Sequence, residues 1–126
     1  MKPEVGLETT LPNSSPQERQ QEHLTHGLIL FDSRYSVIGF EPLLYGNVDS
    51  AFLYRREIIK AALNADASAV ITAHYPRDGN LNPDKTDIAL IKGLEASLEA
   101  IHVRLVDHLI ICGTDSVSFA EQGLLK

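Results

Sequence analysis

The stretch SAVITAHYPRDGNLNPDKTD, residues 68–87, joins an apolar run to a loop rich in Pro, Gly and Asn and then to the start of a second apolar pattern. The run 68–73 is apolar on both sides of an extended chain, which predicts a buried strand of the kind that helices cover. His74 ends this strand, and Asp87 follows thirteen residues later in the first turn of the predicted helix. Two rigid elements can therefore bring an imidazole and a carboxylate to one metal ion.

A hairpin is predicted upstream of this stretch. Residues 28–31 and 35–40 have strand patterns, and Asp32-Ser-Arg34 between them is a turn signal. Glu41 follows the second strand, and Pro42 indicates an interruption or an edge strand.

Two helices and a second strand pair complete the pattern. Apolar residues recur at helical spacing over 51–65, and a second helix is expected to open near Asn82-Pro83-Asp84 and to run to about Ala100. Strands are expected at about 103–112 and 116–119, followed by a short final helix to Leu125. Strands mixed with two substantial helices predict a three-layer α/β domain.

The composition is that of one globular domain. The chain has 126 residues, of which 44% are hydrophobic and 22% charged. No apolar stretch reaches the roughly 18 residues of a membrane span, and the start of the chain has no signal-peptide pattern, so a cytoplasmic location is expected. Residues 1–22 contain Pro3, Pro12 and Pro16 and are predicted to be a tail or linker before a domain at 23–126.

Charge and cysteine usage limit the partners and the chemistry. The net charge is −6, with 17 acidic and 11 basic residues, which disfavours direct binding of DNA. Arg55, Arg56 and Lys60 form the nearest approach to a basic cluster and are interpreted as a solvated helix face. Cys112, the single cysteine, lies in an apolar run and is interpreted as a core residue.

Several short segments, in order along the chain, carry a resemblance to a known family. They are Leu28-Ile-Leu-Phe-Asp-Ser33, Val37-Ile-Gly-Phe-Glu41, Tyr45-Gly-Asn-Val-Asp49, Tyr54-Arg-Arg-Glu57, Ala73-His74, Asp87-Ile88, Val106-Asp-His-Leu-Ile110 and Gly123-Leu-Leu125. Together they resemble the RadC family, bacterial proteins linked to DNA repair whose C-terminal half is an MPN domain with a JAMM metalloprotease motif. The resemblance implies a curved mixed β-sheet between helices, related to the cytidine-deaminase fold. Family members usually carry a longer N-terminal part of helix-hairpin-helix character, and nothing here resembles it.

The JAMM pattern is a Glu upstream of His-x-His, then seven residues, Ser, two residues and Asp. On this chain it falls on Glu41, His74, Pro76, Asp84 and Asp87. The resemblance implies that Glu41 is the general base and that His74 and Asp87 are zinc ligands. Pro76 offers no ligating side chain, and Asp84 replaces the Ser, so the implied zinc site is incomplete.

Other roles remain open for the same residues. His74 can be a hydrogen-bonded histidine at a strand end, and Glu41 a carboxylate facing solvent. Asp87 can belong to a helix cap in which Asn82 or Asp84 is the N-cap residue.

Compensating ligands are a further alternative. Asp78 and Asp84 can replace the lost imidazole, or form an Asp-rich site for a harder cation together with Asp87. His108 is expected to make a hydrogen bond within the core or to a residue that holds the metal. His23, His26 and His102 belong to no recognisable constellation and are interpreted as surface or strand-end residues.

Two functions follow from these observations. One is a zinc hydrolase of the peptidase or isopeptidase type, and the other is a non-catalytic MPN-fold module that binds a peptide or protein. The replacements at Pro76 and Asp84 favour the module. A zinc nucleobase deaminase is disfavoured because the Cys-x-x-Cys pair is absent from the sequence.

Overall fold

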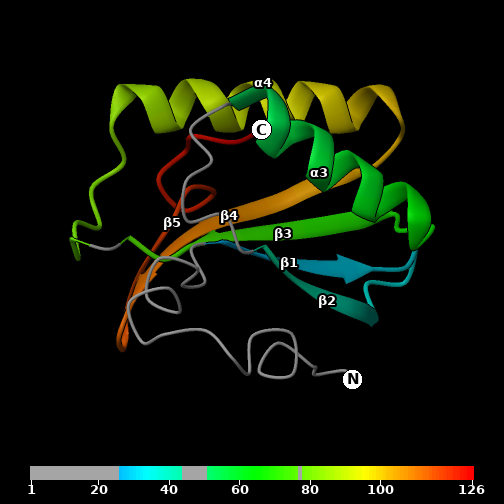
Figure 1. Ribbon diagram of the computed structural model, residues 1–126, viewed down its shortest axis with the longest axis horizontal. Helices are drawn as coiled ribbons and strands as arrows, with labels where there is room; N and C mark the ends of the chain where they lie inside the picture. Colours follow the sequence, from blue (N-terminus) through cyan, green and yellow to red (C-terminus); the bar gives the residue numbers. More distant parts are fainter. Residues whose placement is uncertain (1–25, 44–50, 77) are drawn as a thin grey trace, which may run out of the picture.

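The computed structural model describes residues 26–43 and 51–126, with the exception of residue 77. The predicted tail at 1–22 and the segment 45–49 lie outside these residues. In the described part, five strands form one sheet and two helices pack on it (Figure 1). None of the described helices combines the length and the hydropathy needed to cross a membrane.

The predicted hairpin is confirmed, with shifted ends. Strand β1 (His26–Phe31) pairs antiparallel with β2 (Val37–Leu43). The Asp32 carboxylate holds the turn, because its Oδ1 accepts the backbone N–H groups of Arg34 and Ser36 at 2.9 and 3.0 Å. Tyr35, expected in the second strand, lies in the turn with φ of 61°.

The sheet is mixed, in the order β2-β1-β3-β4-β5. Strand β3 (Ala69–His74) pairs antiparallel with β1 and parallel with β4 (Arg104–Cys112), which pairs antiparallel with β5 (Asp115–Ser118). β2 is therefore an edge strand, and this accommodates Pro42, which has no N–H for a second neighbour.

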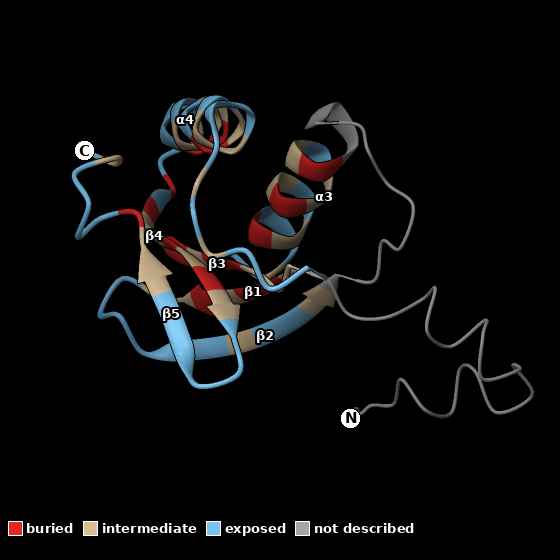
Figure 2. Ribbon diagram, turned by 90° about the vertical axis from the view of Figure 1, so that its left-hand side faces the viewer, coloured by how far each residue is buried: buried red, intermediate tan, exposed pale blue. Residues whose placement is uncertain are grey.

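Both predicted long helices are present and share one face of the sheet. Figure 2 shows α3 (Ala51–Asn64) and α4 (Lys85–Ala100) side by side above the strands. The described residues thus form two layers, a sheet and a pair of helices, and a third layer is not among them. Ala69 and Ala73, on the other face of β3, are only 1% and 7% exposed.

The core lies between the helices and the sheet. Tyr54, Ile58 and Ala62 of α3 and Ile91, Leu94 and Leu98 of α4 are buried, as their spacing of three and four residues predicts. They pack with buried strand residues, namely Leu28, Leu30, Val70, Leu105 and Ile110.

Strand β4 contains a bulge that determines which side chains face this core. The register shifts from Val70 opposite Leu105 to Ile71 opposite Asp107, so that Val106 is the extra residue. Because of it, Leu105 and His108 are both buried although they are three residues apart.

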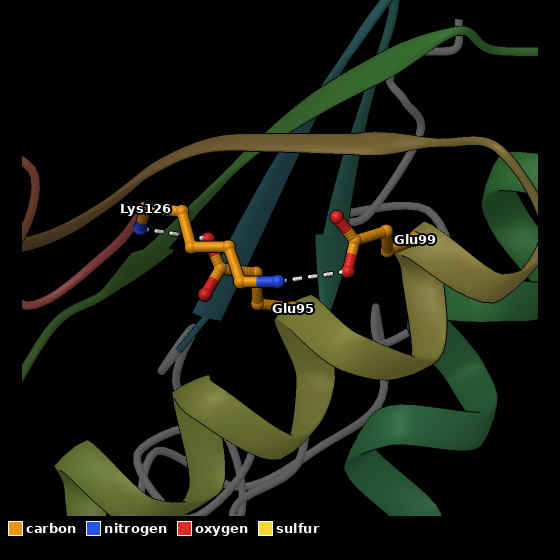
Figure 3. A network of polar contacts seen from close by, with 3 residues as sticks. All are labelled: Glu95, Glu99 and Lys126. Atoms are coloured by element: carbon orange, nitrogen blue, oxygen red, sulfur yellow. Dashed lines mark hydrogen bonds and ion pairs between the residues drawn. The ribbon is translucent and has the colours of Figure 1, made fainter.

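The end of the chain differs from the sequence prediction. Residues 119–123 form turns instead of a helix, and Gly123 has φ of 74°. Lys126 returns to α4 (Figure 3), where its backbone N–H donates to Glu95 Oε2 and its Nζ to Glu99 Oε1, both at 3.0 Å. Cys112 is also a correction, because it is exposed at the end of β4 and not in the core.

Candidate functional site

Two histidines face each other where β1 begins and β3 ends. His26 is the first residue of β1 and His74 the last of β3, and the antiparallel register makes them direct partners. Their rings stack with centroids 5.0 Å apart and an interplanar angle of 13°. The strand pairing therefore sets an imidazole pair at the edge of the core.

A small cavity of about 100 Å³ lies beside this pair. Strands and both helices contribute its lining, which consists of His26, Tyr54, His74, Asp87, Leu90, Ile91 and His108. The Tyr54 ring packs on the His26 ring with centroids 4.9 Å apart. Its hydroxyl is buried and has no hydrogen-bond partner among the described residues.

His108 reaches the cavity from β4. Its Nδ1 lies 2.6 Å from Thr72 Oγ1, and both side chains are buried. The Phe119 ring closes the other side, edge-on to the imidazole at a centroid distance of 4.8 Å. His108 is thus held by a core hydrogen bond and by packing.

Asp87 enters the cavity from the first turn of α4. Asp84 is the N-cap residue of this helix, and its Oδ1 accepts the backbone N–H of Asp87 at 2.7 Å. The Asp87 carboxylate in turn accepts the N–H of Asp84 at 3.5 Å, which completes a capping box. The capping role considered for these two residues is therefore present, and Asp87 also lines the cavity.

Burial shifts the pKa values of three side chains that line the cavity. Burial, with a smaller contribution from nearby His74, lowers the pKa of His26 to about 4. Burial likewise lowers the pKa of His108 to about 3, again with His74 nearby. The pKa of Asp87 is raised, first by partial burial and then by the Asp84 carboxylate, while the N–H of Asp84 and the His74 side chain oppose the rise. At neutral pH, His26 and His108 are therefore uncharged.

Burial also raises the pKa of Tyr54, an effect that the adjacent Thr72 hydroxyl opposes. Thr72 Oγ1 also lies 2.6 Å from His108 Nδ1, and the Tyr54 hydroxyl makes no hydrogen bond of good geometry with the described residues. The Tyr54 hydroxyl is thus a buried polar group of the cavity wall without the hydrogen bond that such groups usually make.

The remaining predicted residues lie outside the cavity lining. Glu41 is exposed and lies within β2, opposite Leu28, not after the strand as expected. Directly opposed residues of an antiparallel pair point to the same face, so Glu41 leaves the sheet on the helix side. Asp78 is exposed, and its Oδ1 accepts the N–H of Asn80 at 2.9 Å.

The JAMM positions do not by themselves provide a three-ligand zinc site. His74 and Asp87 line the cavity, but the Pro76 ring has no lone pair to offer. In the part of the chain that the structure describes, no three His, Cys, Asp or Glu side chains gather closely enough to hold a metal ion. The zinc-ligand roles of His74 and Asp87 remain predictions.

His26 is the cavity residue that sequence reasoning missed. Leu28 and Leu30 are the inward positions of β1, and the alternation of a strand extends the same face back to His26. The alternation was a usable signal, but the stacking on His74 requires the register of two strands that are separated by residues 32–68.

Comparison with known proteins identifies a family for this chain. The model of a family described as the RadC-like JAB domain matches residues 8–124. The chain is 40% identical to a UPF0758 protein of Pseudomonas fluorescens strain SBW25 over 107 residues, which cover 85% of this chain and 48% of that protein. It is 39% identical to a UPF0758 protein of Saccharophagus degradans over 109 residues, 86% of this chain and 49% of that protein. The chain therefore spans about half the length of these curated relatives.

Proposed function

The chain belongs to the RadC-like JAB domain family, and we propose that it is a binding module of this fold that lacks the peptidase activity implied by the JAMM resemblance. One observation carries the proposal: among the five JAMM positions, only His74 and Asp87 line the cavity. A hydrolase needs a third ligand, a base and an oxyanion donor in the same place.

The residue at the serine position supports this interpretation. Asp84 is exposed and its carboxylate is engaged with the N–H of Asp87. An ionised carboxylate donates no hydrogen bond, and its charge would repel a developing oxyanion. Asp84 therefore stabilises the helix start and is unsuited to the catalytic role of the serine.

The second function, a zinc-dependent peptidase or isopeptidase, has its own support. His74 and Asp87 share one cavity, as two ligands of one ion would. Glu41 is on the helix side of the sheet, one strand beyond β1, and is the candidate base. This function needs a third ligand and a path from Glu41 to the metal.

The partner that we propose for the module is a peptide or a protein segment. Val37, Ile38 and Phe40 of the edge strand β2 are 64%, 43% and 54% exposed. An edge strand offers unpaired backbone groups, and exposed apolar side chains beside them provide contacts for an added strand. The net charge of −6 opposes a DNA partner.

A peptidase assay separates the two functions. The untagged chain, supplied with one equivalent of zinc, is incubated with linear and isopeptide-linked substrates beside the variant Glu41→Gln. We expect turnover that is no higher than that of the variant. Zinc-dependent cleavage by the wild-type chain that Glu41→Gln abolishes would overturn the module proposal and establish the hydrolase.

The partner surface is tested by selecting peptides from a displayed library on the immobilised chain. The selected peptides should bind the variant Phe40→Ser at least about tenfold more weakly, a loss of about 1.4 kcal/mol. The matched control is Leu63→Ser, since Leu63 is 58% exposed on α3. Equal binding to all three chains would remove β2 as the binding edge.

A further inference from the structure

Strand β2 forms one edge of the sheet, and in the part of the chain that the structure describes it pairs with β1 alone (Figure 1). Pro42 lies opposite Gly27 and has no N–H, so the two residues cannot exchange a pair of backbone hydrogen bonds. Because antiparallel pairing alternates with a period of two residues, the backbone N–H and C=O of Phe40 also point away from β1. Phe40 therefore presents a donor and an acceptor at the outer edge of the sheet.

The Phe40 side chain leaves the sheet on the face that the two helices do not cover. Its partner in β1 is Ile29, whose neighbour Leu28 is buried on the helix side. A Cβ atom at Gly27 would lie 3.3 Å from two carbon atoms of the Phe40 ring, so the ring extends over this glycine. The Phe40 side chain is still 54% exposed, and Val37 is 64% exposed. An apolar contact surface thus lies beside the outward backbone groups.

Glu41 gives the same edge a negative charge on the other face. It is exposed, it follows Phe40 directly, and it is the only charged residue of β2. A strand added to β2 has one residue opposite Phe40 and the next opposite Glu41, with side chains on alternate faces. The first of these residues meets an apolar surface, and the second meets a carboxylate.

Building on the binding function proposed above, we infer that the segment bound at β2 is an added strand with an apolar residue opposite Phe40 and a Lys or Arg opposite Glu41. Backbone hydrogen bonds provide the affinity of an added strand, and alternate side chains provide its specificity. Opposite charges on directly opposed residues stabilise a strand pair, and like charges destabilise it. The net charge of −6 on the chain further attracts a basic segment.

A second copy of the chain is a poorer occupant of this edge. Each copy carries a net charge of −6, which opposes association of the two. Pro42 also lies on the outward side of β2, where it offers no N–H. A pair of β2 strands would lack the donors of both prolines, whereas a peptide strand loses only one.

The charge preference is tested by selecting peptides from a displayed library in parallel on wild type, Glu41→Lys and Glu121→Lys. We expect peptides that bind wild type to be enriched in Lys and Arg beside an apolar residue, and peptides that bind Glu41→Lys to have Asp or Glu there instead. A basic peptide selected on wild type should bind Glu41→Lys about fivefold more weakly. Glu121→Lys is the matched control, because Glu121 is an exposed glutamate beyond β5, at the opposite edge of the sheet.

The strand geometry is tested on the same basic peptide by methylating one backbone nitrogen at a time. Methylation of the residue opposite Phe40 removes the N–H that would bond to β2, and it should weaken binding about tenfold. The two flanking N–H groups point away from β2, so their methylation should have a smaller effect. Affinity should therefore alternate along the peptide with a period of two residues.

The outcomes separate this partner from the binding function itself. Peptides that depend on Phe40 but remain basic when selected on Glu41→Lys overturn the basic partner and leave the binding function in place. An equal loss of affinity in Glu121→Lys assigns the preference to net charge and overturns the role of Glu41. The absence of alternation on methylation overturns the added strand. Peptides that bind Phe40→Ser as tightly as wild type, or a library without binders, overturn the binding edge as well.

Sedimentation of the chain alone tests the remaining occupant. We expect a monomer at the concentrations used for peptide binding. A dimer that dissociates in the variant Phe40→Ser would assign the edge to a second copy and overturn the peptide partner. Circular dichroism of each variant checks that a loss of binding does not come from unfolding.

Discussion

Single residues in the cavity have environments that shift their chemistry. His108 shows this most clearly, because it is buried, bonded to Thr72 and uncharged at neutral pH. The pKa of its imidazole is lowered from 6.5 to about 3 by burial. His108 therefore becomes protonated at a pH several units lower in the folded chain than in the unfolded chain.

The consequence is a loss of stability in acid. Below pH 6.5 the unfolded chain takes up a proton at His108 and the folded chain does not until about pH 3. Stability attributable to this histidine is present above pH 6.5 and should fall by about 1.4 kcal/mol per pH unit below it. Urea unfolding of wild type and His108→Asn between pH 7 and 5 measures the difference, with His102→Asn as the exposed control. Parallel pH curves for wild type and His108→Asn would contradict the assignment.

The Tyr54 hydroxyl is buried and lacks a hydrogen-bond partner among the described residues. Removing a buried unsatisfied group relieves its desolvation cost, so Tyr54→Phe should equal or exceed the wild-type stability by up to about 1 kcal/mol in the absence of metal. Thermal unfolding of the chelator-treated proteins measures this. A loss above about 1 kcal/mol would mean that the hydroxyl has a partner in solution.

The start of α4 combines a structural role, the helix cap, with the candidate ligand Asp87. Asp84 accepts the N–H of Asp87 at 2.7 Å, and N-cap carboxylates of this type stabilise by about 1 kcal/mol. Asp84→Ala should lower the free energy of unfolding by that amount, while Asp84→Asn should change it by only a few tenths, since asparagine caps as well. Chemical denaturation of the three proteins checks this, and equal stability of Asp84→Ala would mean that the cap contributes nothing measurable.

Elements were also where sequence reasoning was most successful. The apolar spacing of Ile91, Leu94 and Leu98 predicts which face of α4 is buried. The sequence leaves Asn82 and Asp84 as alternative N-cap residues, and Asp84 has this role in the structure. Local patterns gave a wrong prediction where contacts with a distant part of the chain determine the structure. The predicted final helix is absent because residues 119–123 form turns next to Ser118 and Phe119, whose hydrogen-bond partners lie in β4.

The whole molecule determines what the cavity contains. His26, His74 and His108 come from three strands, and their proximity depends on the register of β1 with β3 and on the bulge at Val106. No periodicity in one segment encodes such a register. The single-segment pair His74 and Asp87 was therefore visible in the sequence, whereas the contribution of His26 was not.

The same global packing predicts how the domain responds to a core truncation. Leu98 of α4 is fully buried, at 0% exposure, against the sheet that carries the cavity histidines. Leu98→Ala should cost about 2–5 kcal/mol because it removes buried methyl groups and leaves a cavity. Leu63→Ala truncates the same side chain at a position 58% exposed and should stay within about 0.5 kcal/mol of wild type. Urea denaturation compares the pair, and a cost below about 1 kcal/mol for Leu98→Ala would mean that α4 docks loosely on the sheet. In that case the wall of the cavity that carries Asp87 would be mobile, and a metal site built on Asp87 would lose its rigid support.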